Sequence, residues 1–440
     1  MGGRAMMMEP DGTLGAAIAS ESLGLTDTMI NGAGGCRSRT QIMLHELIPS
    51  YSPENVCCRR SKCFSEQSRL PCTYINNDDI VFGTSPKIQS SVDSVSEITS
   101  KRALLLDTLG ASLICTDYSG LTGSGRKDPI TIKGDLSAMS FSEGYDVAMC
   151  TILSTVDMDT GRDGKSVNIL GYSIMDLGWE YGVQDIRHLL GLMGVKLNCV
   201  PGCLPEPESV RGCGKAALNI MIHPEYCIRT AKMLESRFGT PYLRLKEGAP
   251  IGYPAVRAFV IDVAREMDVD PKPALDYIDE EARAVHKVLM NFDRIASSLY
   301  AKGFVIRSDS SAVYPLMRWM IEAFGMAPRM VKAFDEEYMP EITGYLESVG
   351  HSDALAGAAG EVEVVFTDGL SALEGRNSRT PAGYVEVRLP RGRQLDLVGR
   401  TMVGTRGCRY VLDEMMNGIR RFRCGQPTAI QYRPGGSEEE

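Results

Sequence analysis

The strongest constraint on the fold is an alternation of short β-rich runs with longer helical stretches along nearly all of the 440 residues. Short apolar runs rich in β-branched side chains predict buried strands. We expect nine of them, at residues 27–30, 111–117, 166–171, 195–200, 218–222, 304–308, 329–333, 362–367 and 384–389. The stretches between them, such as 179–193, carry apolar residues at helical spacing. Strands that alternate with helices predict parallel sheets built from βαβ units.

Three such units fit the length of the chain, so we predict an α/β protein with three Rossmann-like domains. The N-terminal domain is expected at 1–160 and the middle domain at 161–270. A bridging helix at 271–302 leads to a C-terminal domain at 303–425, and residues 426–440 are expected to form a flexible tail. The stretch MDTGRDGKS at 158–166 is expected to be the linker out of the first domain.

Charge and hydropathy exclude several classes of partner. Lysine and arginine number 47 against 56 acidic residues, a net charge of −9, and no basic stripe stands out, so nucleic acid is not an expected partner. No apolar run reaches the roughly 20 residues that cross a bilayer, and the N-terminal residues lack the apolar stretch of a secretory signal. We therefore expect a soluble, cytoplasmic protein that binds no membrane.

The thirteen cysteines point to metal binding, redox chemistry or plain burial, because structural disulfides are rare in a reducing cytosol. Cys57, Cys58, Cys63 and Cys72 crowd one short segment. The five histidines form neither an HxxxH nor an HExxH pair, which gives no support to zinc-protease chemistry. Iron–sulfur chemistry, which requires thiolates, stays open.

None of the glycine-rich turns makes a convincing phosphate loop. GRDGKS at 161–166 contains Gly-Lys-Ser, but Asp159 occupies the place of the first glycine of that motif, and the residues that follow read as strand rather than helix. GAGGCRS at 32–38 lacks the third glycine of a dinucleotide turn, and GSGRKD at 123–128 is weaker still. We expect no ATP to bind to this chain.

Three cysteines in the first third of the chain lie in predicted loops of one α/β unit. Cys36 follows a strand and opens a helix, where glycines allow close approach and the helix N-terminus favours a thiolate. Cys115 lies in the C-terminal half of the strand expected at 111–117, the end of a parallel sheet at which ligands gather. Cys72 lies among turn residues. These thiols could hold an iron–sulfur cluster, although they lack a compact CxxCxxC spacing.

At these residues the sequence resembles component 1 of nitrogenase and its relatives, which include dark-operative protochlorophyllide reductase, nickel-sirohydrochlorin reductive cyclase and methylthio-alkane reductase. GTLGAAIASESLGLTDTMINGAGGC is similar to the segment that joins the family's first two cluster cysteines. NNDDIVFGTSPKI and LICTDYSGLTG resemble its Val-Phe-Gly-Gly and third-cysteine segments. Similarity continues through VNILGYSIMDLGWEYGVQDIRHLLGLMGVKLNCVPG to VGRTMVGTRGCRYVLDEMMN, so it covers nearly the whole chain in order.

The resemblance assigns metal-binding roles by position. Cys36 and Cys115 match two cluster-ligand positions, and the remaining position falls on Asp11. Asp11 is therefore expected either to ligate iron, as one Asp does in protochlorophyllide reductase, or to cap the helix that follows. Cys72 is the natural spare ligand. The resemblance further implies that Gly32, Gly34 and Gly35 give clearance around the cluster, and that Asp117 and Tyr118 tune it from nearby.

A second departure concerns the active-site metal cluster of catalytic nitrogenase subunits. Where the family has its cysteine ligand this chain has His223, with Cys227 one helical turn further on, and where the family has its late histidine this chain has Val403. Both changes argue against a standard nitrogenase active-site cofactor. His223 and Cys227 otherwise read as a helix-start residue and a packed thiol.

The resemblance implies a cluster-bearing subunit of an ATP-dependent, nitrogenase-like reductase. Its [4Fe-4S] or P-cluster-like centre would lie at the interface of a homodimer or heterotetramer, and a larger metal cluster stays possible. Electrons would come from a separate nitrogenase reductase-like iron–sulfur ATPase. The small-molecule substrate would be a methylthio-alkane, cleaved at its C–S bond, or a tetrapyrrole ring. The alternatives are a non-catalytic scaffold for cofactor assembly and an iron-free binding module.

Overall fold

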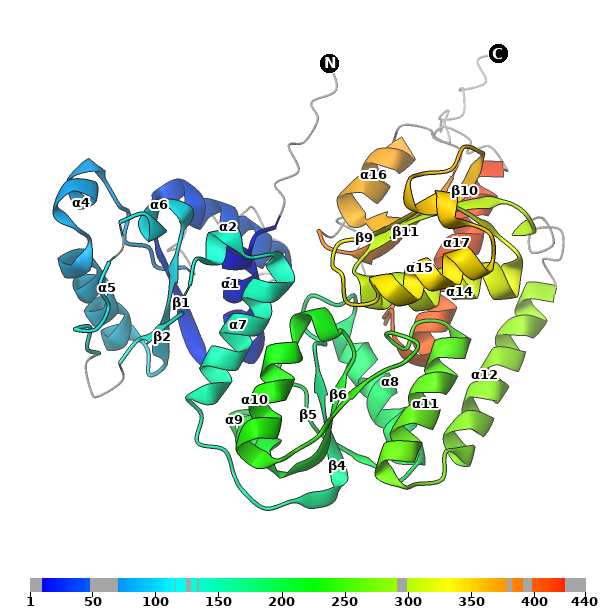
Figure 1. Ribbon diagram of the computed structural model, residues 1–440, viewed down its shortest axis with the longest axis horizontal. Coiled ribbons are helices and arrows are strands. Elements are labelled where there is room, and N and C mark those ends of the chain that lie inside the picture. The colour runs from blue at the N-terminus through cyan, green and yellow to red at the C-terminus, as the bar shows by residue number, and fades with distance from the viewer. Residues whose placement is uncertain are drawn as a thin grey trace, which may run out of the picture.

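Three parallel β-sheets, each accompanied by helices, follow one another along the chain (Figure 1). The computed structural model describes residues 10–47, 70–114, 116–123, 128–132, 134–290, 299–377, 382–390 and 398–423. All of the strand pairs within the three sheets are parallel. This arrangement confirms the predicted α/β architecture, because parallel neighbours need helical crossovers between them.

The first sheet has the strand order β1-β2-β3 and lies closest to the N-terminus. Its strands are β1 (Thr26–Asn31), β2 (Arg102–Asp107) and β3 (Ile130–Thr131). Its helices are α1 (Gly12–Leu23), α2 (Gly34–Leu47), α4 (Asn77–Phe82), α5 (Ser85–Ile98), α6 (Leu109–Ser112), the 3₁₀ turn η3 (Leu136–Ala138) and α7 (Phe141–Ser154). Helices α1 and α7 pack so closely that a Cβ on Gly15 or Gly144 would overlap the facing backbone.

The middle sheet has the order β5-β4-β6-β7. Its strands are β4 (Asp163–Leu170), β5 (Lys196–Cys199), β6 (Ala216–Met221) and β7 (Tyr242–Arg244). Its helices are α8 (Trp179–Leu192), α9 (Pro207–Arg211), η4 (Gly212–Lys215), η5 (Pro224–Tyr226), α10 (Ile228–Phe238) and α11 (Tyr253–Met267). Helix α10 ends at Gly239 in the left-handed conformation, as expected for a glycine after the last helical turn.

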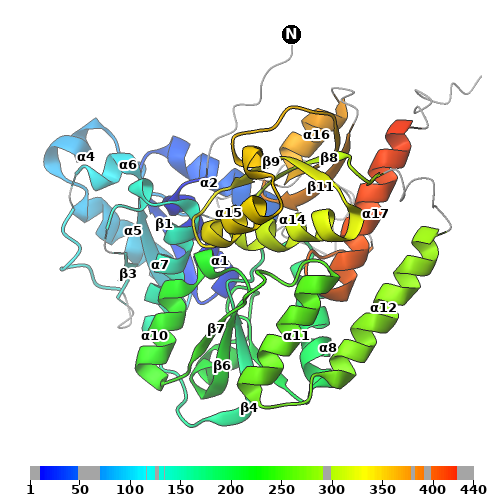
Figure 2. The same cartoon turned by 45° about the vertical axis from the view of Figure 1, so that its right-hand side comes forward.

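The third sheet has the order β11-β10-β8-β9. Its strands are β8 (Gly303–Ser308), β9 (Ala327–Ala333), β10 (Val362–Asp368) and β11 (Gly383–Arg388). Its helices are α14 (Ser310–Phe324), α15 (Met339–Ser348), η7 (Ser352–Leu355), α16 (Gly369–Asn377) and α17 (Gly404–Arg423), and α12 (Lys272–Met290) precedes them. Figure 2 shows α12 and α17 running along one side of the molecule.

Two hydrophobic cores cross from one sheet to the next. One core joins the first and middle sheets through side chains such as Leu14, Tyr145 and Leu234. The other joins the middle and third sheets through Phe259 and Phe304, among others. Because buried side chains pack at nearly crystalline density, these shared cores hold the carboxyl edges of the sheets in fixed positions.

Some expectations fail in detail. The strand predicted at 111–117 is wrong. Residues 111 and 112 belong to the helix α6, and the strand in this part of the sheet is β2, which lies earlier in the chain. The linker predicted at 158–166 is wrong for its last four residues, because β4 starts at Asp163 and includes Gly-Lys-Ser as strand. The predicted bridging helix corresponds to α12, and residues 291–298 and the tail at 426–440 lie outside the described residues. The domain boundaries stay a prediction. No helix in the described part is long and apolar enough to span a membrane.

Candidate functional site

Two thiols lie at the carboxyl end of β1. The chain leaves β1, passes Gly32, and begins α2, whose first turn contains the exposed thiol of Cys36. The segment that contains Cys72 pairs with Ile30 in parallel, and the Cys72 thiol donates to the carbonyl oxygen of Gly32 at 3.2 Å. The backbone N–H of Tyr74 in turn donates to the Cys72 sulfur at 3.4 Å. The fold therefore brings Cys36 and Cys72 to the same edge of the first sheet.

The surroundings of Cys72 keep its thiol protonated in the metal-free chain. Burial raises the pKa of Cys72, and the neighbouring Cys36 sulfur raises it further. The Tyr74 N–H, Arg37 and Lys87 act in the opposite direction on the same pKa. The Cys36 sulfur is thus near enough to act on the pKa of Cys72.

The described residues supply only part of a ligand set for an iron–sulfur cluster. Thiolates are the usual ligands of such clusters, so Cys36 and Cys72 fit in kind. In the ranges that the structure describes, no group of three or more His, Cys, Asp or Glu side chains could hold a metal ion. Cys115, and with it Cys57, Cys58 and Cys63, lies outside the described residues. A cluster at this edge of the first sheet would therefore need further ligands besides Cys36 and Cys72, from residues outside the described ranges or from a second chain.

The Asp11 carboxylate has two partners within the chain. Its Oδ1 accepts the backbone N–H of Leu14 at 3.0 Å and so caps α1. Its Oδ2 forms an ion pair with Arg39 at 3.1 Å, which ties the start of α1 to α2. These contacts match the helix-capping reading of Asp11, and iron ligation by this residue stays a prediction.

The three glycines near Cys36 meet different surroundings. A Cβ on Gly32 would overlap the side chain of Thr108, and a Cβ on Gly34 would lie 3.2 Å from the ring of Tyr74. Among the described residues, nothing lies within 4 Å of a Cβ on Gly35. The absence of a side chain at Gly32 is therefore required by the fold, while the space over Gly35 is open to a ligand or a second chain.

A polar network at the ends of β1 and β2 joins the predicted neighbour Tyr118 to Asn31 and Asp107, which the sequence analysis did not single out. Asn31 at the end of β1 donates to Asp107 at the end of β2 at 2.8 Å and to the Tyr118 hydroxyl at 3.0 Å. The Tyr118 hydroxyl donates to Asp107, and burial followed by this carboxylate raises the pKa of Tyr118. The other predicted neighbour, Asp117, faces solvent and accepts the Ser119 N–H and hydroxyl at 2.9 Å each, which lowers the pKa of Asp117.

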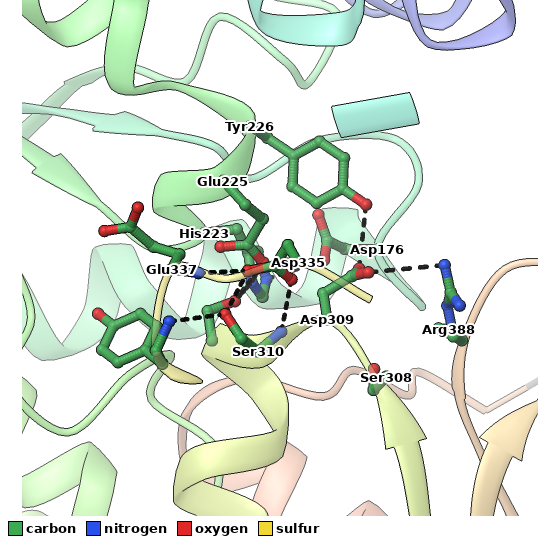
Figure 3. A network of polar contacts seen from close by, with 12 residues as sticks. Asp176, His223, Glu225, Tyr226, Ser308, Asp309, Ser310, Asp335, Glu337 and Arg388 are labelled. Atoms are coloured by element: carbon green, nitrogen blue, oxygen red, sulfur yellow. Dashed lines mark hydrogen bonds and ion pairs between the residues drawn. The ribbon is translucent and has the colours of Figure 1, made fainter. Parts of the chain in front are cut away.

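A second concentration of polar groups lies between the middle and third sheets (Figure 3). Asp176 follows β4, His223 follows β6, Asp309 follows β8, and Arg388 ends β11. All four line a cavity of about 60 Å³ whose wall includes apolar side chains such as Met402. Ligands of open parallel sheets bind outside the carboxyl ends of the strands, and here two such ends face one cavity.

The His223 ring in this cavity has an unusual pKa. Its Nε2 lies 3.2 Å from Asp176 Oδ1, and its Nδ1 lies 2.6 Å from the Ser311 hydroxyl. Burial by itself lowers the pKa of the ring, but Asp176, then Glu225 and Asp309, outweigh it and raise the pKa of His223 to about 9. The ring is therefore an imidazolium at neutral pH.

Glu225 lies behind His223 and is almost fully buried, with a side chain only 3% exposed. The Ser311 hydroxyl donates to Glu225 Oε1 at 2.6 Å, while Glu225 Oε2 is buried and has no hydrogen-bond partner in the part of the chain that the structure describes. Burial, together with the nearby Asp335, raises the pKa of Glu225 well above its ordinary value. Its Oε1 lies 3.8 Å from His223 Nδ1, and the nearby imidazole acts in the opposite direction on the same pKa.

A cation faces these groups across the cavity. The Arg388 guanidinium lies over the ring of Phe334 at 3.7 Å and 3.5 Å from Asp309. Asp309 also accepts the hydroxyl of Tyr226 at 3.0 Å. The cavity thus carries an imidazolium and a guanidinium beside two carboxylates, which suits a polar or charged ligand atom more than a hydrocarbon.

The sequence singled out only part of this cavity. His223 lines it, whereas Cys227 is buried beneath it and its thiol donates to the His223 carbonyl oxygen at 3.4 Å. Val403 is fully buried. Asp176, Asp309 and Arg388 were missed, although polar residues directly after predicted strands, or at their ends, were a usable signal for the last two.

The family is shown by comparison with known proteins. Residues 13–374 match the family described as nitrogenase component 1 type oxidoreductase. Because that match covers most of the chain, the chain belongs to this family of oxidoreductases.

Relatives and solved structures agree with that assignment. A light-independent protochlorophyllide reductase subunit from Rhodospirillum rubrum is 31% identical over 209 residues, which make up 47% of this chain and 34% of that protein. The corresponding protein from Bradyrhizobium sp. BTAi1 is 24% identical over 325 residues, 70% of this chain and 59% of that protein. The chain thus spans about a third to three-fifths of these relatives. A structure named nitrogenase Cp1 at pH 6.5 has a TM-score of 0.73 at 16% identity, covers 99% of this chain and 98% of its own, and shows the same fold.

Proposed function

We propose that this chain is the iron–sulfur cluster-bearing subunit of a two-component, ATP-dependent reductase that acts on an organic substrate. The placement of Cys36 and Cys72 at the carboxyl end of β1, in a member of the nitrogenase component 1 type family, carries the proposal. A second component-1-type chain would complete the cluster site. A separate iron–sulfur ATPase would supply the electrons.

Cys36 and Cys72 would hold the cluster together with Cys115 and ligands from the second chain. When bound, the cluster supplies single electrons at low potential. This chain's own contribution is to place both thiols at the end of β1, to keep Cys72 partly buried, and to leave open space over Gly35. The network of Asn31, Asp107 and Tyr118 fixes the loops behind the thiols.

Two substrate classes remain candidates. The relatives are named for the reduction of protochlorophyllide, which supports a tetrapyrrole ring. The cavity lined by Asp176, His223, Asp309 and Arg388, called the central cavity below, has a volume of about 60 Å³. This volume is far below the roughly 300–1,000 Å³ of pockets that bind drug-sized ligands. A tetrapyrrole would therefore need a site completed by a second chain, whereas a small methylthio-alkane would need only a modest opening of this cavity.

The test is iron and acid-labile sulfide per chain after anaerobic purification, with an EPR spectrum after dithionite. We expect about two irons per chain for one four-iron cluster shared by two chains. Cys36→Ala and Cys72→Ala should each lower the iron content, and Cys150→Ala, a half-buried thiol on α7, is the matched control. An iron-free wild-type chain, or iron unaffected by either variant, would contradict the proposal.

Turnover is tested by adding the reductase-type iron–sulfur ATPase and ATP, with protochlorophyllide and a methylthio-alkane as separate probes. Reduction of only one probe identifies the substrate class. A chain that loads iron but reduces neither probe would favour a scaffold for cofactor assembly over a reductase.

A further inference from the structure

The backbone at Tyr74, two residues after Cys72, adopts a conformation that side-chain-bearing residues rarely take. Tyr74 has a φ of 50°, in the left-handed region that favours glycine. A bulky residue is strained there, so the conformation persists only where the surroundings hold it. The contacts that hold this turn therefore bear on the position of the neighbouring thiol.

Both polar groups of the Tyr74 backbone are engaged. Its N–H donates to the Cys72 sulfur at 3.4 Å, and its carbonyl oxygen accepts the Lys87 ammonium at 2.9 Å, a charge-assisted hydrogen bond. We infer that Lys87 is a positioning residue for Cys72, because it holds Tyr74 in the turn that directs a backbone N–H at the Cys72 sulfur. The inference rests on the proposed function, in which this sulfur is a cluster ligand.

The start of α4 fixes the Lys87 ammonium in its turn. Lys87 lies in the first turn of α5, next to α4 (Figure 1), and donates to Asp79 Oδ2 at 2.6 Å. The same Asp79 oxygen accepts the Asn76 N–H at 2.8 Å, and the Asn76 side chain accepts the Asp79 N–H at 3.0 Å, which together form a capping box. Lys87 thus ties the Tyr74 carbonyl to the capped end of α4.

Pairing with β1 fixes the chain on both sides of Tyr74. The Thr73 N–H donates to the Ile30 carbonyl oxygen at 3.1 Å, and the Ile75 N–H donates to the Gly32 carbonyl oxygen at 3.0 Å. The Tyr74 N–H and carbonyl instead point to the thiol and to the ammonium. Loss of the ammonium should therefore loosen the turn locally and leave the pairing with β1 in place.

The ring of Tyr74 extends the same turn toward the other thiol. A Cβ on Gly34 would lie 3.2 Å from this ring, and the Arg37 guanidinium lies 5.5 Å from the ring centroid. Gly34 and Arg37 flank Cys36 at the start of α2. Tyr74 therefore contacts both thiol segments, Cys72 through its backbone and the Cys36 turn through its ring.

The N–H directed at Cys72 bears on the electron transfer proposed for this chain. Hydrogen bonds to cluster sulfurs are among the factors that set a reduction potential. When the Cys72 thiol ionises to bind iron, its own donation to the Gly32 carbonyl ends. The Tyr74 N–H can still donate to the sulfur, and the bond becomes charge-assisted. Because this donor favours the more negative, reduced state, its loss should make the potential more negative.

The first test requires neither iron nor a partner. Amide hydrogen exchange of the metal-free, full-length chain is compared between wild type and Lys87→Met, which keeps the side-chain length and removes the donors. The Tyr74 amide should exchange about tenfold faster or more in Lys87→Met, the effect of losing one charge-assisted hydrogen bond on a local opening. Lys101→Met, at an exposed lysine just before β2, is the matched control. Wild-type exchange at Tyr74 in Lys87→Met would overturn the inference.

Variants of Tyr74 itself test the role of the left-handed turn. Glycine adopts this conformation without strain, so Lys87→Met should change the exchange of residues 72–75 less in a Tyr74→Gly background. Tyr74→Val places a β-branched residue there and should speed that exchange although Lys87 is intact. The rates are corrected for the intrinsic effect of each side chain. Equal protection in Tyr74→Gly and Tyr74→Val would contradict the role of the turn.

The second test uses the iron-loaded chain and measures its midpoint potential by redox titration followed by EPR. Lys87→Met should make the potential more negative, and Lys101→Met should leave it at the wild-type value. Because Lys87→Met also removes a charge, Tyr74→Val, which removes none, should shift the potential in the same direction. A shift in Lys87→Met alone would show an effect of charge and overturn the positioning role.

The inference and the proposed function fail in different ways. If the wild type carries no iron, the proposed function fails, and the exchange measurements still decide whether Lys87 holds the Tyr74 turn. If the wild type carries iron and neither Lys87→Met nor Tyr74→Val alters the potential, the positioning role fails while the proposed function stands.

Discussion

At the scale of single residues, His223 ties the stability of the folded chain to pH. An unfolded histidine titrates near 6.5 and folded His223 near 9, so protonation of the ring stabilises the fold fully below pH 6.5. That contribution is lost as the pH rises through 9. We expect the free energy of unfolding of wild type relative to His223→Gln to fall by about 2–3 kcal/mol between pH 6 and 10.

Urea denaturation at a series of pH values measures this difference. His188→Gln serves as the control, because its exposed ring on α8 lacks the buried carboxylate neighbours of His223. A difference between wild type and His223→Gln that stays flat across this pH range would show that the folded ring is not held protonated.

Asp11 is the second residue whose role a substitution can decide. Asp11→Ala removes the cap of α1 and the ion pair to Arg39, so the free energy of unfolding should fall by about 1 kcal/mol. Asp11→Asn keeps a capping oxygen and should cost less. Iron content distinguishes the two readings: loss of iron in Asp11→Asn at nearly unchanged stability would show ligation, and unchanged iron would leave Asp11 as a cap alone.

At the scale of elements, the turn from β1 into α2 sets the geometry of the thiol site. Gly32→Ala should lower the free energy of unfolding by roughly 1–3 kcal/mol, because the new Cβ overlaps Thr108. Part of that loss should return in the double variant with Thr108→Ala, since the two side chains compete for one space. Additive effects in thermal or urea denaturation would contradict this account.

Gly35 offers the matched comparison in the same turn. Gly35→Ala meets open space and lies in the first turn of α2, so the metal-free chain should be as stable or slightly more stable. If a cluster or second chain occupies that space, iron content should fall in this variant while stability of the metal-free chain does not. Unchanged iron would remove the clearance role predicted for Gly35.

At the scale of the whole molecule, an apolar surface follows the Cys72 segment. Ile80, Val81 and Phe82 of α4 are 60%, 74% and 84% exposed, an arrangement typical of a surface that binds another protein. We expect the chain to associate through this surface, and Phe82→Asp to shift sedimentation toward the monomer. Tyr300→Ser, which alters a similarly exposed side chain just before β8, is the control. A monomeric wild type would contradict the expectation.

The sequence by itself determined the three parallel sheets, because the period of apolar residues depends only on local geometry. Eight of the nine predicted strands are present. The strand predicted at 111–117 is absent, and β2 takes its place in the sheet. The apolar residues of β2 are mainly leucines, which are less typical of strands than β-branched residues. The fold brings the Cys72 segment to the end of β1, next to the turn that leads to Cys36, and the metal-binding roles of both thiols stay a prediction.

Only the tertiary structure decided the composition of the central cavity and the state of its groups. Asp176, His223, Asp309 and Arg388 come from four segments spread over almost half of the chain, and no local pattern reports that they meet. The pKa of Glu225 is raised by its burial and by Asp335, and the pKa of His223 is raised, against the effect of burial, by carboxylates such as Asp176. Electrostatic energies depend on distances between side chains and on exclusion of water, which exist only once the chain has folded.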